Sequence, residues 1–332
     1  SMRKGTSSCP NAAVIRPILD SMSAVVVSCG ICPRYSDIDA YHMAACALDE
    51  AVRNAVAVGA DPRRLSALDN FCWPDPVESP QNPDGAYKLG QLVRANQALF
   101  DLCVAYGVPL ISGKDSMKND YRAGELRISV PPTLLLSVMG QMDDARRAVT
   151  SDAKEAGDRV YVLGATRDEL GASEFLAAKN LLGRQVPRVD ADANAPRYLA
   201  LHEAINKGLV RSCHDLSDGG LAVGLAETAL SGALGMEIDL TKVPVEGVPL
   251  HSPLWPAVVL FSESQGRFVI TAKQEAAPSL EALLGPHGLS YLGTVTQRPR
   301  FLLKGKDEEP LVDLQVEGLR SAFKETLAPT KF

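Results

Sequence analysis

The sequence predicts an α+β protein with two domains, and three observations support that class. Short strands rich in β-branched residues alternate with segments whose apolar residues recur at helical spacing. The 332 residues are enough for two hydrophobic cores, which aliphatic side chains must fill because aromatic residues make up only 5%. A polar, turn-rich stretch at 151–158 interrupts the pattern. We therefore expect an N-domain over 1–149 and a C-domain over 150–332.

The N-domain is expected to be a sheet covered by helices. Short β-branched segments bounded by turn residues predict strands at 12–17, 24–29, 64–71, 108–112 and 132–142. A helix is predicted over 40–58, where apolar residues recur every three or four positions before Gly59 ends it. A second helix is predicted over 87–106, with Leu89, Val93 and Phe100 among the residues expected to face the core.

The C-domain is expected to be built of α/β layers, because predicted strands and helices alternate along it. Apolar, β-branched runs predict strands at 159–164, 236–240 and 266–272. Helical periodicity predicts helices at 197–207, 221–231 and 274–284.

Composition and charge exclude several classes of function. The net charge of −6 and the lack of a basic block argue against a nucleic-acid partner, and no apolar run reaches membrane-spanning length. Seven cysteines, an odd number, indicate reduced thiols in a cytoplasmic protein. Cys29 and Cys32 form a CxxC pair, which we interpret as structural thiols because no second pair supplies metal-ligand spacing.

The decapeptide RSCHDLSDGG, at 211–220, gathers polar groups between two apolar runs. Asp215 ends a probable strand, and Gly219 and Gly220 open a helix. Backbone amides at a helix start favour a phosphate, and Asp215 could face the cation that accompanies it. Alternatively, Ser217 or Asp218 caps the helix and the glycines serve a tight turn. The residues alone leave both interpretations open.

A second polar stretch, DEAVRN at 49–54, lies within the first predicted helix. Glu50 and Asn54 are four residues apart and therefore share one helix face. A carboxylate and an amide oxygen are ligands suited to Mg²⁺. The alternative is a solvated helix face with an Asp49–Arg53 ion pair.

Two further stretches carry polar chemistry. In ISGKDSMKND, at 111–120, Gly113, Lys114 and Ser116 suit phosphate binding, although a polar hairpin loop has the same composition. In FSESQGRF, at 261–268, polar side chains precede a strand and could hydrogen-bond a substrate amide or hydroxyl, or simply cap a hairpin turn; they are Glu263, Ser264 and Gln265. Together, the four stretches supply what ATP-dependent activation of an amide requires.

The segments HDLSDGGLAVGLAE, SGKDSMK and ESQGRF carry a resemblance to a known family. The chain resembles phosphoribosylformylglycinamidine synthase, within the superfamily of aminoimidazole ribonucleotide synthetase, and the match spans nearly the whole chain. The resemblance implies a two-domain aminoimidazole ribonucleotide synthetase-like unit. It also implies ATP or ADP with Mg²⁺ as cofactors.

The resemblance assigns roles to individual positions. Glu50, Asn54 and Asp215 match Mg²⁺ ligands, and Ser217 matches a nucleotide contact beside them. Asn11 falls where the family usually has an aspartate ligand, so weaker Mg²⁺–nucleotide binding is implied. The loop with Gly113, Lys114 and Ser116 matches one that reaches the active site of a partner half.

The family's synthetase region holds two tandem copies of such a unit, and the first copy carries an ESHNHPS-type segment with a catalytic histidine. That segment is absent here, so the resemblance implies the second half. This half would be auxiliary in ATP-dependent amidation of formylglycinamide ribonucleotide and inactive alone. Its implied partners are the first half and a glutaminase domain or subunit, with a homodimer when the unit is isolated. The alternatives are a complete self-dimerising enzyme, such as aminoimidazole ribonucleotide synthetase or a small-molecule kinase, and a non-catalytic nucleotide-binding scaffold.

Overall fold

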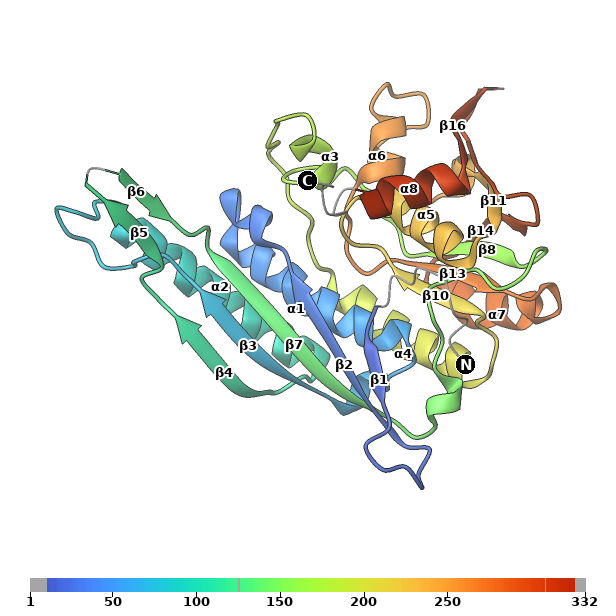
Figure 1. Ribbon diagram of the computed structural model, residues 1–332, viewed down its shortest axis with the longest axis horizontal. Coiled ribbons are helices and arrows are strands. Elements are labelled where there is room, and N and C mark those ends of the chain that lie inside the picture. The colour runs from blue at the N-terminus through green and yellow to red at the C-terminus, as the bar shows by residue number, and fades with distance from the viewer. Residues whose placement is uncertain (1–10, 125, 308, 326–332) are drawn as a thin grey trace, which may run out of the picture.

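The computed structural model describes residues 11–124, 126–307 and 309–325, which form two sheets in successive parts of the chain (Figure 1). A five-stranded sheet comes from the first part and a seven-stranded sheet from the second. Helices pack against both sheets. The predicted α+β class, with a sheet-and-helix unit followed by α/β layers, is confirmed.

The first sheet is antiparallel except at one edge. Its strand order is β1 (Ala13–Ile15), β2 (Ala24–Ile31), β7 (Thr133–Met142), β3 (Leu65–Cys72) and β4 (Leu110–Ser116). Only the β3–β4 pair is parallel. A parallel pair needs a long crossover, and helix α2 (Gly85–Tyr106) lies in this connection. Strand β4 is longer than predicted and includes the whole of SGKDS.

Helix α1 (Ala40–Ala57) is the buried centre of the molecule. It begins at Asp39, whose carboxylate accepts hydrogen bonds from the backbone N–H groups of Tyr41 and His42. Nearly all its side chains after Met43 are buried, because the first sheet, α2, α4 (Ala191–Asn206) and β10 (Ser212–Asp215) pack around it. A helix enclosed in this way can be apolar on every side.

Helix α2 packs on one side only and ends at Gly107, which adopts the left-handed conformation at φ 65°. Leu99 and Leu102 are buried. The prediction that Leu89, Val93 and Phe100 face the core is wrong, since all three are exposed. The helix carries apolar residues on two faces, and periodicity alone did not reveal which face meets the sheet.

Alternate side chains of β2 and β7 lie on opposite faces of the first sheet. Val26 and Leu136 are buried beneath the helices. On the other face Val27 lies directly opposite Met139, and both are exposed, as is Ile31. We refer to Val27, Ile31 and Met139 as the open sheet face.

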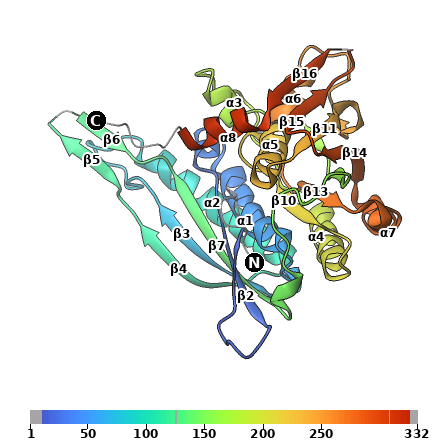
Figure 2. The same cartoon turned by 45° about the vertical axis from the view of Figure 1, so that its right-hand side comes forward.

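The second sheet is also mostly antiparallel (Figure 2). Only the β11–β15 pair is parallel. The strand order is β10 (Ser212–Asp215), β13 (Phe268–Ala272), β8 (Arg159–Leu163), β14 (Leu289–Thr296), β11 (Gly235–Asp239), β15 (Arg300–Lys304) and β16 (Pro310–Gln315).

Helices cover both faces of the second sheet, so its central strands are buried on both sides. One layer holds α4 (Ala191–Asn206) and α7 (Ala277–Leu284). The other holds α5 (Gly220–Gly232), α6 (Trp255–Phe261) and α8 (Val316–Glu325). Strand β8 divides its side chains between the layers: Tyr161 joins the core with α4, and Val162 joins the core with α5.

The core beneath α4 continues into the first unit without a break. Residues of α1 and α2 and residues of α4, β8 and β13 belong to one buried apolar cluster. The predicted boundary at 149/150 lies between β7 and β8, where the chain passes from one sheet to the other. It stays a prediction, because the two units share this core.

The remaining elements are short. They are the 3₁₀ helices η1 (Pro33–Asp37), η2 (Pro62–Arg64), η3 (Ala145–Arg147), η4 (Leu240–Lys242), η5 (Gln274–Ala276) and η6 (Gly285–His287), the helix α3 (Glu174–Ala177), and the strand pairs β5 (Asp120–Ala123) with β6 (Leu126–Ser129) and β9 (Thr166–Arg167) with β12 (Val245–Glu246). Within the described residues, every helix is too short or too polar to span a bilayer.

Candidate functional site

The candidate site lies where α1 of the first unit meets the turn between β10 and α5 of the second. Helix α1 packs directly against β10 (Figure 1). This contact brings the DEAVRN stretch of α1 to the HDLSDGG stretch, which begins with the last two residues of β10. Glu50 is close enough to Asp215 for the two charges to affect each other's ionisation.

Arg53 joins the two units at the centre of this contact. Its Nη1 lies 2.5 Å from Asp49 Oδ2 and donates to Gln265 Oε1 at 2.8 Å. Its Nη2 lies 3.3 Å from Asp215 Oδ2. The Asp49–Arg53 ion pair therefore forms, but the interpretation of this face as solvated is wrong, because both side chains are 0% exposed.

Asp49 is held by a further set of donors. The hydroxyls of Tyr106 and Tyr198 donate to its Oδ1, the latter at 2.7 Å, and Asn194 Nδ2 donates to the same oxygen at 3.2 Å. Because Tyr198 and Asn194 belong to α4, the ion pair is fixed by both units. A buried charge pair requires such additional hydrogen bonds to offset the loss of water.

His214 stands beside Asp215 with both ring nitrogens hydrogen-bonded. Nδ1 lies 2.6 Å from Asn11 Oδ1, and Nε2 lies 2.8 Å from Glu227 Oε2. Burial opposes the charged ring, but hydrogen bonds and charges from Asp215 and Glu227 outweigh it and raise the pKa of His214 to about 9. His214 is therefore an imidazolium at neutral pH, and both nitrogens donate.

Asn11 has a positioning role in the structure. Its Nδ2 donates to the Cys213 carbonyl at 3.0 Å while its Oδ1 accepts from His214. Both ends of the amide are thus engaged by β10. A metal contact from Asn11 stays a prediction.

Asp215 is ionised although it is buried. Burial raises its pKa, but His214 and Arg53 outweigh burial and hold the pKa of this carboxyl below its ordinary value. Two cations already face this carboxylate. A bound metal ion would therefore need further anionic ligands.

The pKa of Glu50, unlike that of Asp215, is raised. Burial is the main cause, and the negative charges of Asp215 and Asp218 add to it. Together they outweigh the attraction of Arg53 and raise the pKa of Glu50 to about 7. Its Oε2 accepts a hydrogen bond from the Ile31 N–H at 2.9 Å. A bound cation would lower the pKa of this carboxyl and so favour its ionised form at neutral pH.

Asn54 supplies the observation that best fits a metal ion. Its Nδ2 donates to the Cys29 carbonyl at 3.2 Å, but its buried Oδ1 has no hydrogen-bond partner among the described residues. An unpaired buried amide oxygen one helix turn from the Glu50 carboxyl matches the oxygen ligands that Mg²⁺ prefers. The described residues hold no group of three or more His, Cys, Asp and Glu side chains arranged to bind a metal alone. Phosphate oxygens would have to complete the site.

Gly219 and Gly220 form a tight turn between β10 and α5. Both have positive φ, at 77° and 64°. The Gly219 N–H donates to Glu263 Oε1 at 2.8 Å, and the Gly220 N–H donates to the Ser217 carbonyl at 3.0 Å. Since both amides are already paired, the turn explains these glycines, and a phosphate contact from their amides stays a prediction.

Two polar residues close to this turn differ in exposure. Ser217 is half-buried and Asp218 is exposed. The pKa of Asp218 is raised to about 6, mainly by partial desolvation and next by the negative charge of Glu263. Asp218 was considered only as a helix cap, and its place beside Glu50 and Asp215 adds a carboxylate to the site.

The ESQ stretch is engaged within the protein. Glu263 Oε2 accepts from the Tyr35 hydroxyl at 2.7 Å, and its Oε1 accepts from the Gly219 and Glu174 N–H groups. Ser264 Oγ accepts from the Arg167 N–H at 2.9 Å. Gln265 bonds Arg53 through Oε1 and the Glu263 carbonyl through Nε2. These side chains fix the turn and Arg53, and a substrate contact from them stays a prediction.

Gly113, Lys114 and Ser116 lie apart from this site. They belong to edge strand β4 rather than to a loop, and in both views β4 is well separated from β10 (Figures 1 and 2). Lys114 is exposed, and Ser116 Oγ bonds Asn119. A Cβ on Gly113 would overlap the Asp69 carboxylate, so a larger residue here would require the Asp69 side chain to move.

The sequence also matches known families. Residues 10–142 match "AIR synthase related protein, N-terminal domain", and residues 155–306 match "AIR synthase related protein, C-terminal domain". The chain belongs to the AIR synthase related family. Its two domain families meet between β7 and β8, in the order in which the two sheets occur.

Curated members of this family include similar proteins. Phosphoribosylformylglycinamidine synthase subunit PurL of Thermococcus sibiricus is 34% identical over 271 residues, which are 82% of this chain and 35% of the relative. The subunit of the same name from Deinococcus radiodurans is 30% identical over 325 residues, 96% of this chain and 41% of the relative. The resemblance to this synthase is confirmed. The chain spans about two fifths or less of the length of these relatives.

Solved structures show the same fold. T. maritima PurL complexed with FGAR has a TM-score of 0.74 at 21% identity, over 95% of this chain and 49% of the neighbour. The ADP complex of T. maritima PurL has a TM-score of 0.71 at 21% identity, over 93% of this chain and 46% of the neighbour. At these identities the likeness concerns the fold.

Proposed function

We propose that the chain is the second half of the synthetase region of a phosphoribosylformylglycinamidine synthase. It would take part in the ATP-dependent amidation of formylglycinamide ribonucleotide in purine biosynthesis. The identity to PurL subunits supports this proposal. The match to nearly half of T. maritima PurL also agrees with one copy of a repeated unit.

The chain would bind ATP or ADP with Mg²⁺ between α1 and the β10–α5 turn. One observation carries this proposal: Glu50 of one unit lies close to Asp215 of the other, and Asn54, one turn along α1 from Glu50, leaves its buried Oδ1 unpaired among the described residues. The ADP complex of T. maritima PurL supports the choice of nucleotide. Acidic side chains are suited to holding a phosphate only through a cation.

Each residue of the site would have a defined task. The bound Mg²⁺ would neutralise phosphate charge. Glu50 would lose its proton on binding and face the cation, and Asn54 would offer its free Oδ1. Arg53 and His214 would hold Asp215 in place, and Ser217 would contact the nucleotide. Asn11 adds no negative charge, so the metal would be retained weakly.

Amidation itself would need a second synthetase half. The sequence has five histidines and no ESHNHPS-type segment, and His214 has both ring nitrogens engaged. Gly113, Lys114 and Ser116 would reach a partner half, and the exposure of strand β4 supports this. Ammonia would come from a glutaminase domain or subunit. The open sheet face would pair with the other half, or with a second copy in a homodimer.

A cytoplasmic location remains a prediction from composition. The six cysteines in the described ranges are unpaired thiols. Burial, with a smaller contribution from Glu50, raises the pKa of both Cys29 and Cys32. These raised values favour structural thiols over redox chemistry in the CxxC pair.

An amidation assay tests the function. We would measure formylglycinamidine ribonucleotide made from formylglycinamide ribonucleotide, ATP and ammonium chloride. The chain alone should give no product above background, whereas the chain mixed with a first half that carries the histidine segment should give ATP-dependent product. Product from the chain alone, or no gain over the first half alone, would contradict the proposal.

A further inference from the structure

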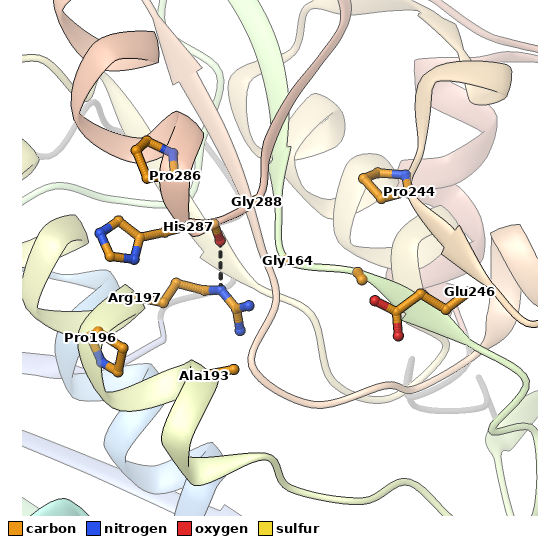
Figure 3. A pocket seen from close by; sticks show the side chains of 10 residues that line it. Gly164, Ala193, Pro196, Arg197, Pro244, Glu246, Pro286, His287 and Gly288 are labelled. Carbon is orange, nitrogen blue, oxygen red and sulfur yellow. Dashed lines mark hydrogen bonds between the residues drawn. The ribbon is translucent and has the colours of Figure 1, made fainter.

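A cavity lies within the C-terminal unit, apart from the candidate site. Its volume is about 410 Å³, and it is bounded by the start of α4, the end of β8, η6 and β12 (Figure 3). This volume falls in the range of small-molecule sites. Much of the lining is rigid: Pro196, Pro244 and Pro286 form apolar walls, and Gly164 and Gly288 present backbone.

Two opposite charges face each other across this cavity. Figure 3 shows Arg197 on one side and the Glu246 carboxylate on the other, with open space between them. They do not pair with each other in the structure. Glu246 Oε2 instead accepts from Arg167 Nε at 2.8 Å.

Hydrogen bonds hold the Arg197 guanidinium in place but do not use all of its N–H donors. Its Nε donates to the His287 carbonyl at 3.0 Å, and its Nη1 donates to Asn194 Oδ1 and to the Gly266 carbonyl. Its Nη2 has no partner in the part of the chain that the structure describes. A preorganised donor of this kind loses little side-chain entropy when it binds an anion.

We propose that this cavity is a binding site for a small zwitterion. A carboxylate or similar anion would bind Arg197 Nη2, and an ammonium group would bind the Glu246 carboxylate. A ligand that carries both charges would contact both Arg197 and Glu246, whereas a simple anion or a simple cation would contact only one of them. This site does not involve the nucleotide region and does not rest on the proposed function.

Ligand titration with matched probes tests the site. Calorimetry or ligand-detected NMR would measure binding of glycine, β-alanine and γ-aminobutyrate, which differ in the separation of their charges. Butyrate and butylamine serve as single-charge controls. We expect at least one zwitterion to bind at least tenfold more tightly than either control.

Two substitutions locate the binding. Glu246→Gln should lower the affinity for the best-binding zwitterion to that for butyrate. It should leave the fold intact because Glu246 is largely exposed. Glu203→Gln, at an exposed ion pair near the other end of α4, should have no effect. The proposal is overturned if no zwitterion binds better than both controls, or if Glu246→Gln binds it as the unmodified chain does.

Discussion

The guanidinium of Arg53 lies 3.3 Å from the Asp215 carboxylate, and the two side chains come from different units of the fold. Asp49 completes a buried cluster of one cation and two anions. The position of the β10–α5 turn relative to α1 therefore depends on this contact. The carboxylates proposed to face a metal ion are presented by the same arrangement.

Removal of the Arg53 charge should strongly destabilise the protein. Arg53→Met leaves Asp49 buried without its cation and leaves Asp215 with His214 as its remaining cation, and we expect a loss of roughly 3–5 kcal/mol in the free energy of unfolding. Urea unfolding measures this loss. Arg63→Met is the control, because Arg63 is 68% exposed and its ion pair should contribute about 1 kcal/mol or less. Equal stability of the two variants would show that the Arg53 cluster contributes little.

The ionisation of Glu50 should make stability depend on pH. The pKa of Glu50 in the folded protein is about 7, above its ordinary value of 4.5. The folded state therefore binds the proton more tightly, and stability falls as pH rises from about 4.5 to 7. The loss attributable to Glu50 should be at most about 3 kcal/mol.

Glu50→Gln tests this dependence without metal present. Its stability should fall less than that of the unmodified chain between pH 4.5 and 8, because the glutamine has no proton to lose. Denaturant unfolding at several pH values gives the comparison. Parallel pH profiles for the two proteins would exclude the raised pKa.

Gly220 should not tolerate a side chain. Its φ is 64°, and an added Cβ would lie 2.4 Å from the Ser262 carbonyl oxygen. Gly220→Ala should therefore destabilise the protein by more than 1 kcal/mol. Gly90→Ala is the matched control, because Gly90 lies within α2 and its Cβ would meet nothing within 4 Å. The free energy of unfolding of Gly90→Ala, measured by thermal unfolding, should rise by roughly 0.5–1 kcal/mol. A Gly220→Ala protein of unchanged stability would contradict the tight turn.

The open sheet face should drive self-association of the isolated chain. Val27 and Met139 are opposite each other and exposed, and such apolar patches commonly mark interfaces. Sedimentation at micromolar concentration should show a dimer that Met139→Lys weakens. Val93→Lys, on the exposed side of α2, should leave it intact. A monomeric chain, or equal effects of both lysines, would count against this face.

Much of the fold could be predicted from the periodicity of apolar residues. The α1 helix was predicted at 40–58 and spans Ala40–Ala57, because its apolar pattern ends at a glycine. The orientation of α2 was not predictable, since Phe100 and Leu99 are both apolar and only tertiary packing decides which is buried. Likewise, the sequence could not show that SGKDS extends edge strand β4.

The site was predictable in its acids but not in its cations. The spacing of Glu50 and Asn54 placed them on one helix face. Nothing local indicates that Arg53 is buried, since its partner Asp215 lies 162 positions away. The charge on His214 depends on burial and on hydrogen bonds to Asp215 and Glu227, which only the folded structure reveals. The glycine pair had two interpretations because a tight turn and a phosphate loop use the same residues.

Calorimetric titration of Mg²⁺–ADP into the isolated chain tests the central claim most directly. The nucleotide should bind only with Mg²⁺ present, and Asp215→Asn or Glu50→Gln should weaken binding at least tenfold. Asp143→Asn is the control, because Asp143 is 91% exposed and belongs to a surface ion pair. No binding to the unmodified chain, or equal binding to Asp215→Asn and Asp143→Asn, would contradict a nucleotide–metal site between α1 and the β10–α5 turn.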